Sequence, residues 1–341
     1  MKLRVLAVLI VVLAAPALAQ FATSPNDTAR FLAGMPVTGS LEPLARSSTW
    51  HSYAAALDDA FAKKETAQLG PIRAWMDGHA TQYYRSSATC YYMFSGPDIL
   101  YAHNFFPNAR TYILCGIEPV GAVPDLAAMP EGTVLDGLAG LRQSMSTILR
   151  FHYFITKDMR ADLNRAQLGG TVPLLYIFLA RMGCTVLDTS YVSTPAPGVK
   201  IDFRHGTAYR QTLYYFKTDL SNGGGSAGFL NWCAAQGPGN SLLKAASYLL
   251  HTDGFSTVRS FLLEHSRVIV QDDSGIPLRA FTKGWTVHPY GRYLPHGEMF
   301  GKYYQRDLAE VFANNPPPEL GFAFGYHWQR DRGVLLLATR Q

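Results

Sequence analysis

Apolar residues recur at helical spacing in the first quarter of the chain. Between residues 45 and 61 they are separated by steps of three and four, which predicts an amphipathic helix with an apolar face formed by Trp50, Tyr53, Ala54, Leu57 and Phe61. Ile72, Trp75 and Met76 continue the helical character toward residue 85. We therefore expect residues 20–85 to form a helical segment that packs on the core.

Short apolar runs bounded by turn residues follow this segment. Cys90 to Phe94 and Thr111 to Ile117 predict strands, and Ile99 to Phe106 predicts a helix between them. The connection is close to the shortest that allows two strands to lie parallel in one sheet. Because both runs are apolar on both faces, we expect helices to cover both sides of the sheet.

The pattern continues to the end of the chain. Further helices are predicted at 134–163, 172–182, 242–250 and 257–265, and further strands at 184–187, 199–203, 211–216 and 267–270. Residues 322–328 and 334–339 predict a hairpin with a charged turn at 330–332. The predicted fold is α/β over residues 86–341, with a mostly parallel or mixed sheet covered by helices on both faces and a C-terminal antiparallel hairpin.

The first nineteen residues have the pattern of a secretory signal peptide. Lys2 and Arg4 precede an apolar run that is too short to span a bilayer, and small residues before Gln20 predict cleavage after Ala19. The product is expected to be periplasmic or secreted, with no integral membrane segment after cleavage. Export excludes chemistry that depends on cytosolic NAD, ATP or nucleic acid.

Composition adds two constraints. The chain is 48% hydrophobic and 16% charged, with a net charge of +5 and no basic cluster, so a nucleic-acid partner is not expected. Four cysteines, Cys90, Cys115, Cys184 and Cys233, could form up to two disulfides in an oxidising compartment. Their wide spacing argues against zinc and thioredoxin-like redox sites, and we interpret them as structural.

Acidic residues follow several of the predicted strands. Ser95 and Asp98, Glu118, Asp188, and the pair Asp272 and Asp273 each come at the end of an apolar run. Ligands of open α/β sheets bind outside the carboxyl ends of the parallel strands, so these side chains would converge there. The alternative for each acid is a helix N-cap, and Asp98 before Ile99 fits that role well.

The adjacent carboxylates Asp272 and Asp273 are followed by a turn, Ser274 to Pro277, rather than by a helix. Facing Glu118 across a cleft, they could act as general acid and base or hold a hard divalent cation such as calcium. The candidate catalytic residues are therefore Glu118, Asp272, Asp273, Asp98 and Ser95.

A second candidate is the segment from Trp285 to His296, which combines rings and a guanidinium with Gly and Pro residues. We interpret it as a loop that could act as a lid over a small-molecule or glycan-like ligand, with contacts from Trp285, His288, Tyr290, Arg292 and Tyr293. The alternative is ordinary packing, because aromatic residues make up 13% of the chain.

Three stretches together resemble a pattern in uncharacterised exported proteins of bacteria. They are Ser95-Gly96-Pro97-Asp98 to Phe105-Phe106-Pro107, then Gly116-Ile117-Glu118-Pro119, and later Gln271 to Pro277. The resemblance implies a bacterial, exported protein and implies no activity. Two hypotheses remain: a hydrolase that uses the carboxylates at the strand ends, and a non-catalytic periplasmic binding or envelope-structural protein.

Overall fold

The structure is a computed structural model. It describes residues 23–151, 153, 163, 168–294, 300–314, 316–326 and 333–340. The predicted signal peptide, His296 and the predicted turn at 330–332 lie outside the described residues.

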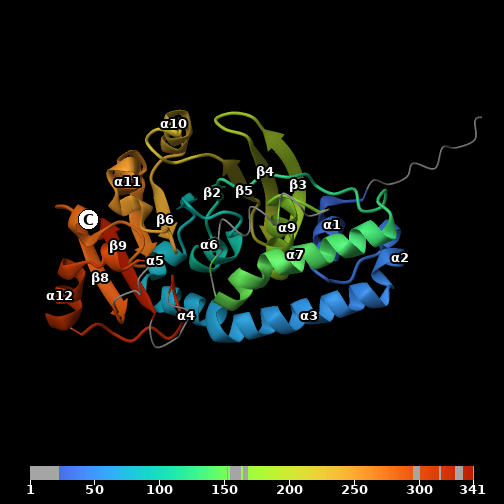
Figure 1. Ribbon diagram of the computed structural model, residues 1–341, viewed down its shortest axis with the longest axis horizontal. Coiled ribbons are helices and arrows are strands. Elements are labelled where there is room, and N and C mark those ends of the chain that lie inside the picture. The colour runs from blue at the N-terminus through green and yellow to red at the C-terminus, as the bar shows by residue number, and fades with distance from the viewer. Residues whose placement is uncertain are drawn as a thin grey trace, which may run out of the picture.

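The described strands form one nine-stranded mixed sheet in the order β3-β4-β5-β2-β1-β6-β7-β9-β8 (Figure 1). The strands are β1 (Cys90–Tyr92), β2 (Thr111–Gly116), β3 (Cys184–Val192), β4 (Gly198–His205), β5 (Gln211–Lys217), β6 (Gly239–Leu243), β7 (Ser266–Gln271), β8 (Trp285–Gly291) and β9 (Val334–Arg340). The central strands β5, β2, β1, β6 and β7 are parallel, and antiparallel pairs extend the sheet at both edges. The α/β prediction is confirmed.

The chain fills the parallel part of the sheet in two directions. From β1 it passes to β2 and β5 on one side, and then returns to β6 and β7 on the other side. This is the doubly wound arrangement. β1 and β6 are parallel neighbours, and the strands that follow each of them are added on opposite sides of the sheet. The loops after β1 and β6 therefore separate at this switch point, where such folds form their ligand crevice.

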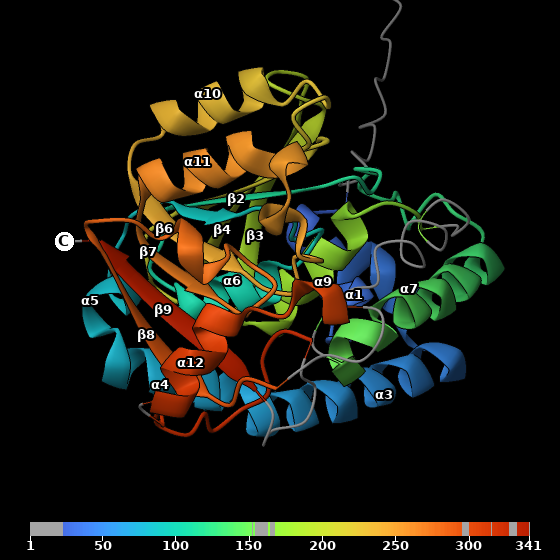
Figure 2. The same ribbon diagram turned by 60° about the vertical axis from the view of Figure 1, so that its left-hand side comes forward.

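Helices cover both faces of the sheet (Figure 2). On one face lie α10 (Ala227–Ala235) and α11 (Ser256–His265). On the other lie the helices α1 (Pro25–Leu32), α3 (Ser48–Lys64), α4 (Gly70–His79), α6 (Ile99–Phe105), α7 (Glu131–Phe151) and α9 (Val172–Arg181). The shorter helices are α2 (Glu42–Ala45), α5 (Thr81–Tyr84) and α12 (Arg306–Asn314).

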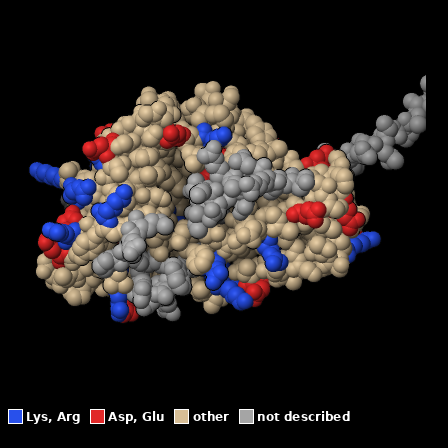
Figure 3. All heavy atoms as spheres, in the orientation of Figure 1, with Lys and Arg blue, Asp and Glu red and all other residues tan. Residues whose placement is uncertain are grey.

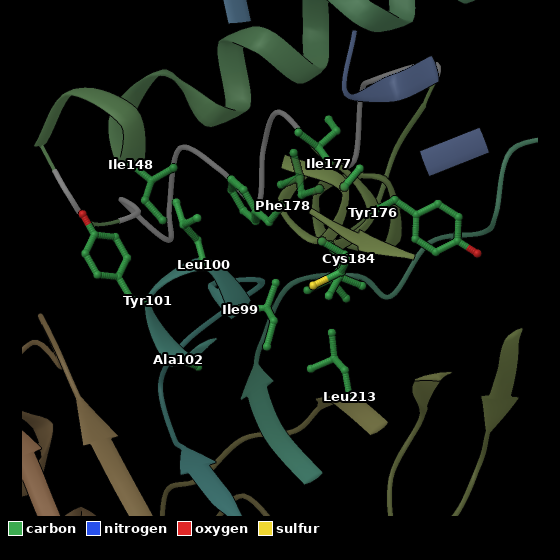
Figure 4. Close-up of a cluster of buried hydrophobic side chains, with 14 of the residues drawn as sticks. Ile99, Leu100, Tyr101, Ala102, Ile148, Tyr176, Ile177, Phe178, Cys184 and Leu213 are labelled. Atoms are coloured by element: carbon green, nitrogen blue, oxygen red, sulfur yellow. The ribbon is translucent and has the colours of Figure 1, made fainter. Parts of the chain in front are cut away.

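Each face has its own hydrophobic core. Along β2, Tyr112 and Leu114 belong to the larger core, whereas Ile113 and Cys115 belong to the smaller one beneath α10 and α11. This alternation is the period of two expected for a strand buried on both sides. Figure 4 shows part of the larger core, in which Ile99 and Leu100 of α6 meet Ile177 and Phe178 of α9.

The predicted N-terminal helix is present and contains an irregular turn. Ser47 caps α3 by accepting a hydrogen bond from the Trp50 amide at 3.1 Å. The helix then passes through a π-helical turn, Glu65–Leu69, directly into α4. Lys64 and Gln68 at this turn are buried, and π-helical turns of this kind often occur at functional sites.

Two expectations from the sequence are wrong. Residues 242–250 do not form a helix: β6 ends at Leu243, and only a 3-10 turn, Leu249–His251, follows. Asn240 and Ser241 obscured this strand in the sequence because they are polar although fully buried, and Ser241 shares a 2.7 Å hydrogen bond with Ser266. Asp188 lies within the edge strand β3 and not at a strand end.

The C-terminal antiparallel pair is present, but with a different first strand. β9 pairs with β8, and the described part of the predicted partner, residues 322–326, is not a strand of the sheet. Trp285–Gly291 is therefore strand and not part of a lid. Pro289 misled the interpretation because it breaks most strands, and it is tolerated here because β8 is an edge strand.

Replacement of Ile113 by Ala tests the packing of the smaller core. Ile113 is fully buried in the central strand β2, so Ile113→Ala is expected to lower the free energy of unfolding by about 2–5 kcal/mol. Leu187→Ala on the edge strand β3, where Leu187 is 39% exposed, should cost much less. Urea denaturation followed by circular dichroism measures both; equal losses would contradict the assigned burial.

Candidate functional site

The carboxyl ends of the parallel strands place several polar side chains at one edge of the sheet. Ser95 and Asp98 follow β1, Glu118 follows β2, Lys244 follows β6, and Asp272 and Asp273 follow β7. These strands are parallel neighbours. The acids that the sequence singles out therefore do lie at the same edge, with the exception of Asp188.

A pocket of about 280 Å³ opens at this edge beside the switch point. Its lining comes from the segments after β1, β2, β5 and β6, and includes Phe94, Gly96, Glu118, Asp219, Leu220, Ala245, Ser247 and Phe255. Of the five candidate catalytic residues, Glu118 is the one that lines this pocket. Its volume lies near the lower end of small-molecule sites, which start at about 300 Å³.

Glu118 is buried, with 1% of its surface exposed. The hydroxyl of Tyr215 donates to the backbone oxygen of Glu118 at 3.0 Å and to its Oε2 at 3.2 Å. Gly116 makes this position possible, since a Cβ there would lie 2.1 Å from Oε2. The carboxylate is thus folded back beside the end of β2, at the wall of the pocket.

The charged side chains that line the pocket are both acidic. They are Glu118 and the exposed Asp219, and within the described residues the lining includes no Lys or Arg. The remaining walls are largely apolar, with the rings of Phe94 and Phe255 in edge-on contact at 5.8 Å. An acidic pocket with apolar walls favours neutral or cationic ligands over anions.

Backbone strain is concentrated beside the same pocket. Among the described residues, the non-glycine residues with positive φ are Phe94, at 62°, and Ala245, Ser247 and Tyr248, between 52° and 56°. All four lie in the loops after β1 and β6, on the two sides of the switch point. Such left-handed conformations are costly for residues with side chains and cluster at ligand sites.

A buried ion pair joins these two loops. Asp98 Oδ2 accepts a hydrogen bond from Lys244 Nζ at 2.7 Å, and the two side chains are 3% and 1% exposed. Asp98 also accepts from the Tyr92 hydroxyl at 2.9 Å and from the Tyr101 amide at 3.1 Å. The N-cap predicted as the alternative to a catalytic role is therefore present, and the same carboxylate also forms a buried ion pair.

Burial shifts the pKa of both members of this pair. It lowers the pKa of Lys244 to about 8, and the neighbouring Asp98 carboxylate opposes that change. Burial also raises the pKa of Asp98, while Lys244 lowers it. The Lys244 ammonium lies 3.1 Å from the centre of the Tyr101 ring, which adds a cation–π contact.

Lys64 is a second buried ammonium, contributed by the helical segment. Its Nζ donates to the backbone oxygen of Ile148 at 3.0 Å and to Gln68 Oε1 at 3.3 Å. Gln68 Oε1 also accepts from the Tyr101 hydroxyl. Burial, together with the charge of Lys244, lowers the pKa of Lys64 to about 7.

Asp272 and Asp273 hold the loop after β6 in place. Asp272 accepts from the Ala245 amide at 3.0 Å and from the Ser274 hydroxyl at 2.6 Å. Asp273 accepts from the Tyr248 hydroxyl at 2.7 Å. Burial, and then the adjacent Asp273, raises the pKa of Asp272 above its usual range. These bonds tie Asp272 and Asp273 to the loop after β6.

Ser95 is likewise committed to the backbone. Its hydroxyl donates to the Gly96 carbonyl at 2.9 Å and accepts from the Cys115 amide at 3.2 Å. These bonds tie the end of β1 to the end of β2. The side chain therefore supports the pocket wall and is not oriented as a nucleophile.

The predicted ligand contacts on 285–293 lie elsewhere. β8 is separated from β1 and β6 by β7 and β9 in the sheet. Tyr290 packs edge-on against Trp75 at 4.9 Å, and the Tyr293 hydroxyl accepts from the Gln305 amide at 2.7 Å. Arg292 is exposed, 4.0 Å from Glu319, and His288 is exposed. Packing, the alternative interpretation, accounts for Trp285, Tyr290 and Tyr293.

Sequence reasoning missed Lys64, Lys244 and Tyr248. The sequence predicted a helix over 242–250, whereas β6 ends at Leu243 and the loop after it carries Lys244 and Tyr248. The single lysine within the apolar run Leu242 to Leu250 could have marked this strand end. Lys64 follows Lys63 at a helix end and carries no signal of its own, because its burial depends on the π-helical turn.

The described residues contain no group of three or more His, Cys, Asp or Glu placed to hold a metal ion. All four cysteines are buried and free, and burial raises the pKa of the Cys115 and Cys184 thiols to about 12. Their role is structural packing.

Charges of both signs are interspersed on the molecular face shown in Figure 3. No helix among the described residues is long and apolar enough to cross a membrane. Comparisons of the chain with protein-family models, curated proteins and solved structures found no match in any of the three.

Removing one partner of the buried pair should destabilise the protein strongly. Lys244→Met leaves Asp98 buried without its cation and is expected to lower the free energy of unfolding by about 3–5 kcal/mol. The double variant Asp98→Asn/Lys244→Met should lose less than the single variant, because no charge then stays unpaired. Urea denaturation measures both, and an additive loss in the double variant would show that the pair is not coupled.

Asp272 should make the free energy of unfolding fall as the pH rises. Because its pKa is raised above the ordinary 3.8, the folded state holds this proton more tightly than the unfolded chain. Stability from this group is complete below pH 3.8 and is lost as the pH rises through the folded pKa. Asp272→Asn should therefore flatten the decline in unfolding free energy above pH 4; an unchanged slope in urea titrations would contradict the assignment.

Proposed function

We propose that the protein binds a nucleoside, or a closely similar molecule with an aromatic ring and a vicinal diol, whose remaining substituent carries no negative charge. The observation that supports this most strongly is the position of Glu118. It is a buried carboxylate at the end of the second strand, in the wall of a pocket at the switch point of a doubly wound sheet.

The position of Glu118 suits a ribose. In doubly wound folds that bind nucleotides, a glycine in the loop after the first strand allows close approach of the ligand, and a carboxylate about 20 residues later accepts hydrogen bonds from ribose hydroxyls. Gly96 and Glu118 have this separation, and both line the pocket. A carboxylate with two acceptor oxygens can bind two adjacent hydroxyls at once.

The apolar walls suit a flat ring. Phe94, Leu220 and Phe255 line the pocket together with Ile117 and Leu249. Aromatic side chains contribute large apolar contact area and orient a ring by edge-on or offset stacking. A base could therefore be held by packing while the sugar is held by Glu118.

The same site disfavours phosphate. Pyrophosphate sites use a glycine-rich loop and the amide groups at a helix N-terminus. Here the helix after β1 has seven residues, and the Asp98 carboxylate already accepts its Tyr101 amide. Glu118 and Asp219 add negative charge to the wall. Rejection of phosphates agrees with the export that the N-terminal sequence predicts.

These contacts favour binding over the hydrolysis suggested by the carboxylate pattern. Acid–base catalysis needs carboxyl groups within reach of the reacting atoms. Asp98 is bonded to Lys244, Asp272 to Ala245 and Ser274, and Asp273 to Tyr248. The three aspartates support the loops around the pocket, and the carboxylates that line it are Glu118 and Asp219.

Isothermal titration with a small panel of ligands tests the proposal. Adenosine and 5′-methylthioadenosine, whose 5′ substituents are uncharged, should bind saturably. 2′-Deoxyadenosine, which lacks the diol, should bind about tenfold more weakly or worse, a loss of ~1.4 kcal/mol. AMP and NAD should also bind more weakly than adenosine. Preference for the phosphorylated ligands, or equal binding of adenosine and its deoxy form, would contradict the proposal.

A matched pair of variants connects this binding to Glu118. Glu118→Gln keeps the size of the side chain but replaces one acceptor oxygen by a donor, so the preference of adenosine over 2′-deoxyadenosine should largely disappear. Glu42→Gln, on an exposed acid of α2, should leave it unchanged. If both variants keep the preference, Glu118 does not contact the diol.

A further inference from the structure

A second carboxylate, Asp219, lines the pocket at the switch point together with Glu118. β2 and β5 are parallel neighbours in which Gly116 pairs with Lys217. Glu118 and Asp219 therefore each lie two residues beyond the same level of the sheet. Glu118 is buried, whereas Asp219 is exposed, so Asp219 lines the pocket where it meets the solvent.

The Asp219 side chain is held in place by its own loop. Its Oδ1 accepts a hydrogen bond from the Ser221 amide at 2.9 Å. Gly224 allows the loop to close against it, since a Cβ at this position would lie 2.5 Å from Asp219 Cγ. A carboxylate that is already oriented loses less side-chain entropy on pairing with a ligand than one that rotates freely.

Asn222 fastens this loop to the segment that carries Phe255. The Asn222 amide donates to the Gly254 oxygen at 2.7 Å, and its Nδ2 donates to the Ser256 hydroxyl at 3.0 Å. These bonds lie on both sides of Phe255 in the sequence, and the half-buried Phe255 also lines the pocket. The walls that contain Asp219 and Phe255 are therefore joined to each other.

Within the described part of the chain, Asp219 has no cationic partner. No lysine or arginine there lies within ion-pair distance of its carboxylate. Asp202 on β4, by contrast, is paired with both Lys200 and Arg210. Fewer than three metal-ligating side chains gather at this point of the described structure, which favours an organic cation over a metal ion as the group that meets Asp219.

We propose that the ligand of this pocket carries a positively charged organic group, which lies between the Asp219 carboxylate and the Phe255 ring. This inference rests on the nucleoside site proposed above, in which the ribose is bound by Glu118. A carboxylate and the face of an aromatic ring both attract an organic cation. The described lining of the pocket includes no Lys or Arg that would repel it.

Calorimetric titration of the full chain with charged and neutral nucleosides tests this proposal. The probes are 5′-amino-5′-deoxyadenosine, whose amine is protonated at pH 7, and 1-methyladenosine, whose methylated base is positively charged at that pH. Adenosine is the neutral reference. At least one of the two cations should bind about threefold more tightly than adenosine or better, since an exposed pair gains little in water. This advantage should nearly disappear when NaCl is raised from about 10 mM to about 1 M, which shortens the screening length from about 30 Å to about 3 Å.

The outcomes separate this proposal from the one on which it rests. If adenosine binds with its preference over 2′-deoxyadenosine but neither cation binds more tightly than adenosine, the cation site is overturned and the nucleoside site stands. An advantage of equal size at both salt concentrations would also overturn the cation site, because it would not come from charge. If adenosine and both cations fail to bind saturably, both proposals are wrong.

Asp219→Asn locates the positive charge of the ligand. Asn keeps the size of the side chain and an oxygen that accepts from the Ser221 amide, so the loop is preserved while the negative charge is lost. The ratio of cation affinity to adenosine affinity should fall to near one. Asp253→Asn, on an exposed acid of the adjoining segment that does not line the pocket, is the matched control and should keep the ratio. An unchanged ratio in Asp219→Asn, or an equal fall in both variants, would overturn the proposal.

Discussion

The bond between Asp98 and Lys244 is the contact on which the candidate site depends. It joins the loops after β1 and β6, the two strands at which the chain changes direction across the sheet. Two charges this deeply buried are stable only when they pair and when other hydrogen bonds satisfy them. Tyr92, the Tyr101 amide and the Tyr101 ring supply those contacts. The pair therefore fixes the separation of the two loops.

The other buried polar groups extend this arrangement on both sides. Asp272 and Asp273 hold the strained segment Ala245–Tyr248 from β7. From the helical segment, Gln68 accepts hydrogen bonds from both Lys64 and the Tyr101 hydroxyl. Left-handed residues on both loops show that the backbone is held in a costly conformation. Such strain persists because the surrounding bonds over-determine it. The result is a preformed pocket wall, which suits binding because little ordering remains when a ligand enters.

Much of the fold could be predicted from the sequence, and the site only in part. The unit from β1 to β2 was predictable because apolar runs are bounded there by Gly and Pro residues, and Asp98 was recognisable as an N-cap. β6 was not, since Asn240 and Ser241 are polar residues that are nevertheless buried inside the sheet. Because β6 was not predicted, Lys244 could not be placed at the switch point from the sequence. β8 was missed because its partner, β9, is distant in sequence and its Pro289 is tolerated only at an edge.

The central claim is that Glu118 meets a ligand diol at the switch point. A crystal structure of the protein soaked with adenosine tests it most directly. The account predicts electron density for the nucleoside in the pocket between the loops after β1 and β6, with both ribose hydroxyls within hydrogen-bond distance of the Glu118 carboxylate and the base against Phe94 or Phe255. Density for the nucleoside elsewhere, or in the pocket with its hydroxyls turned away from Glu118, would contradict it.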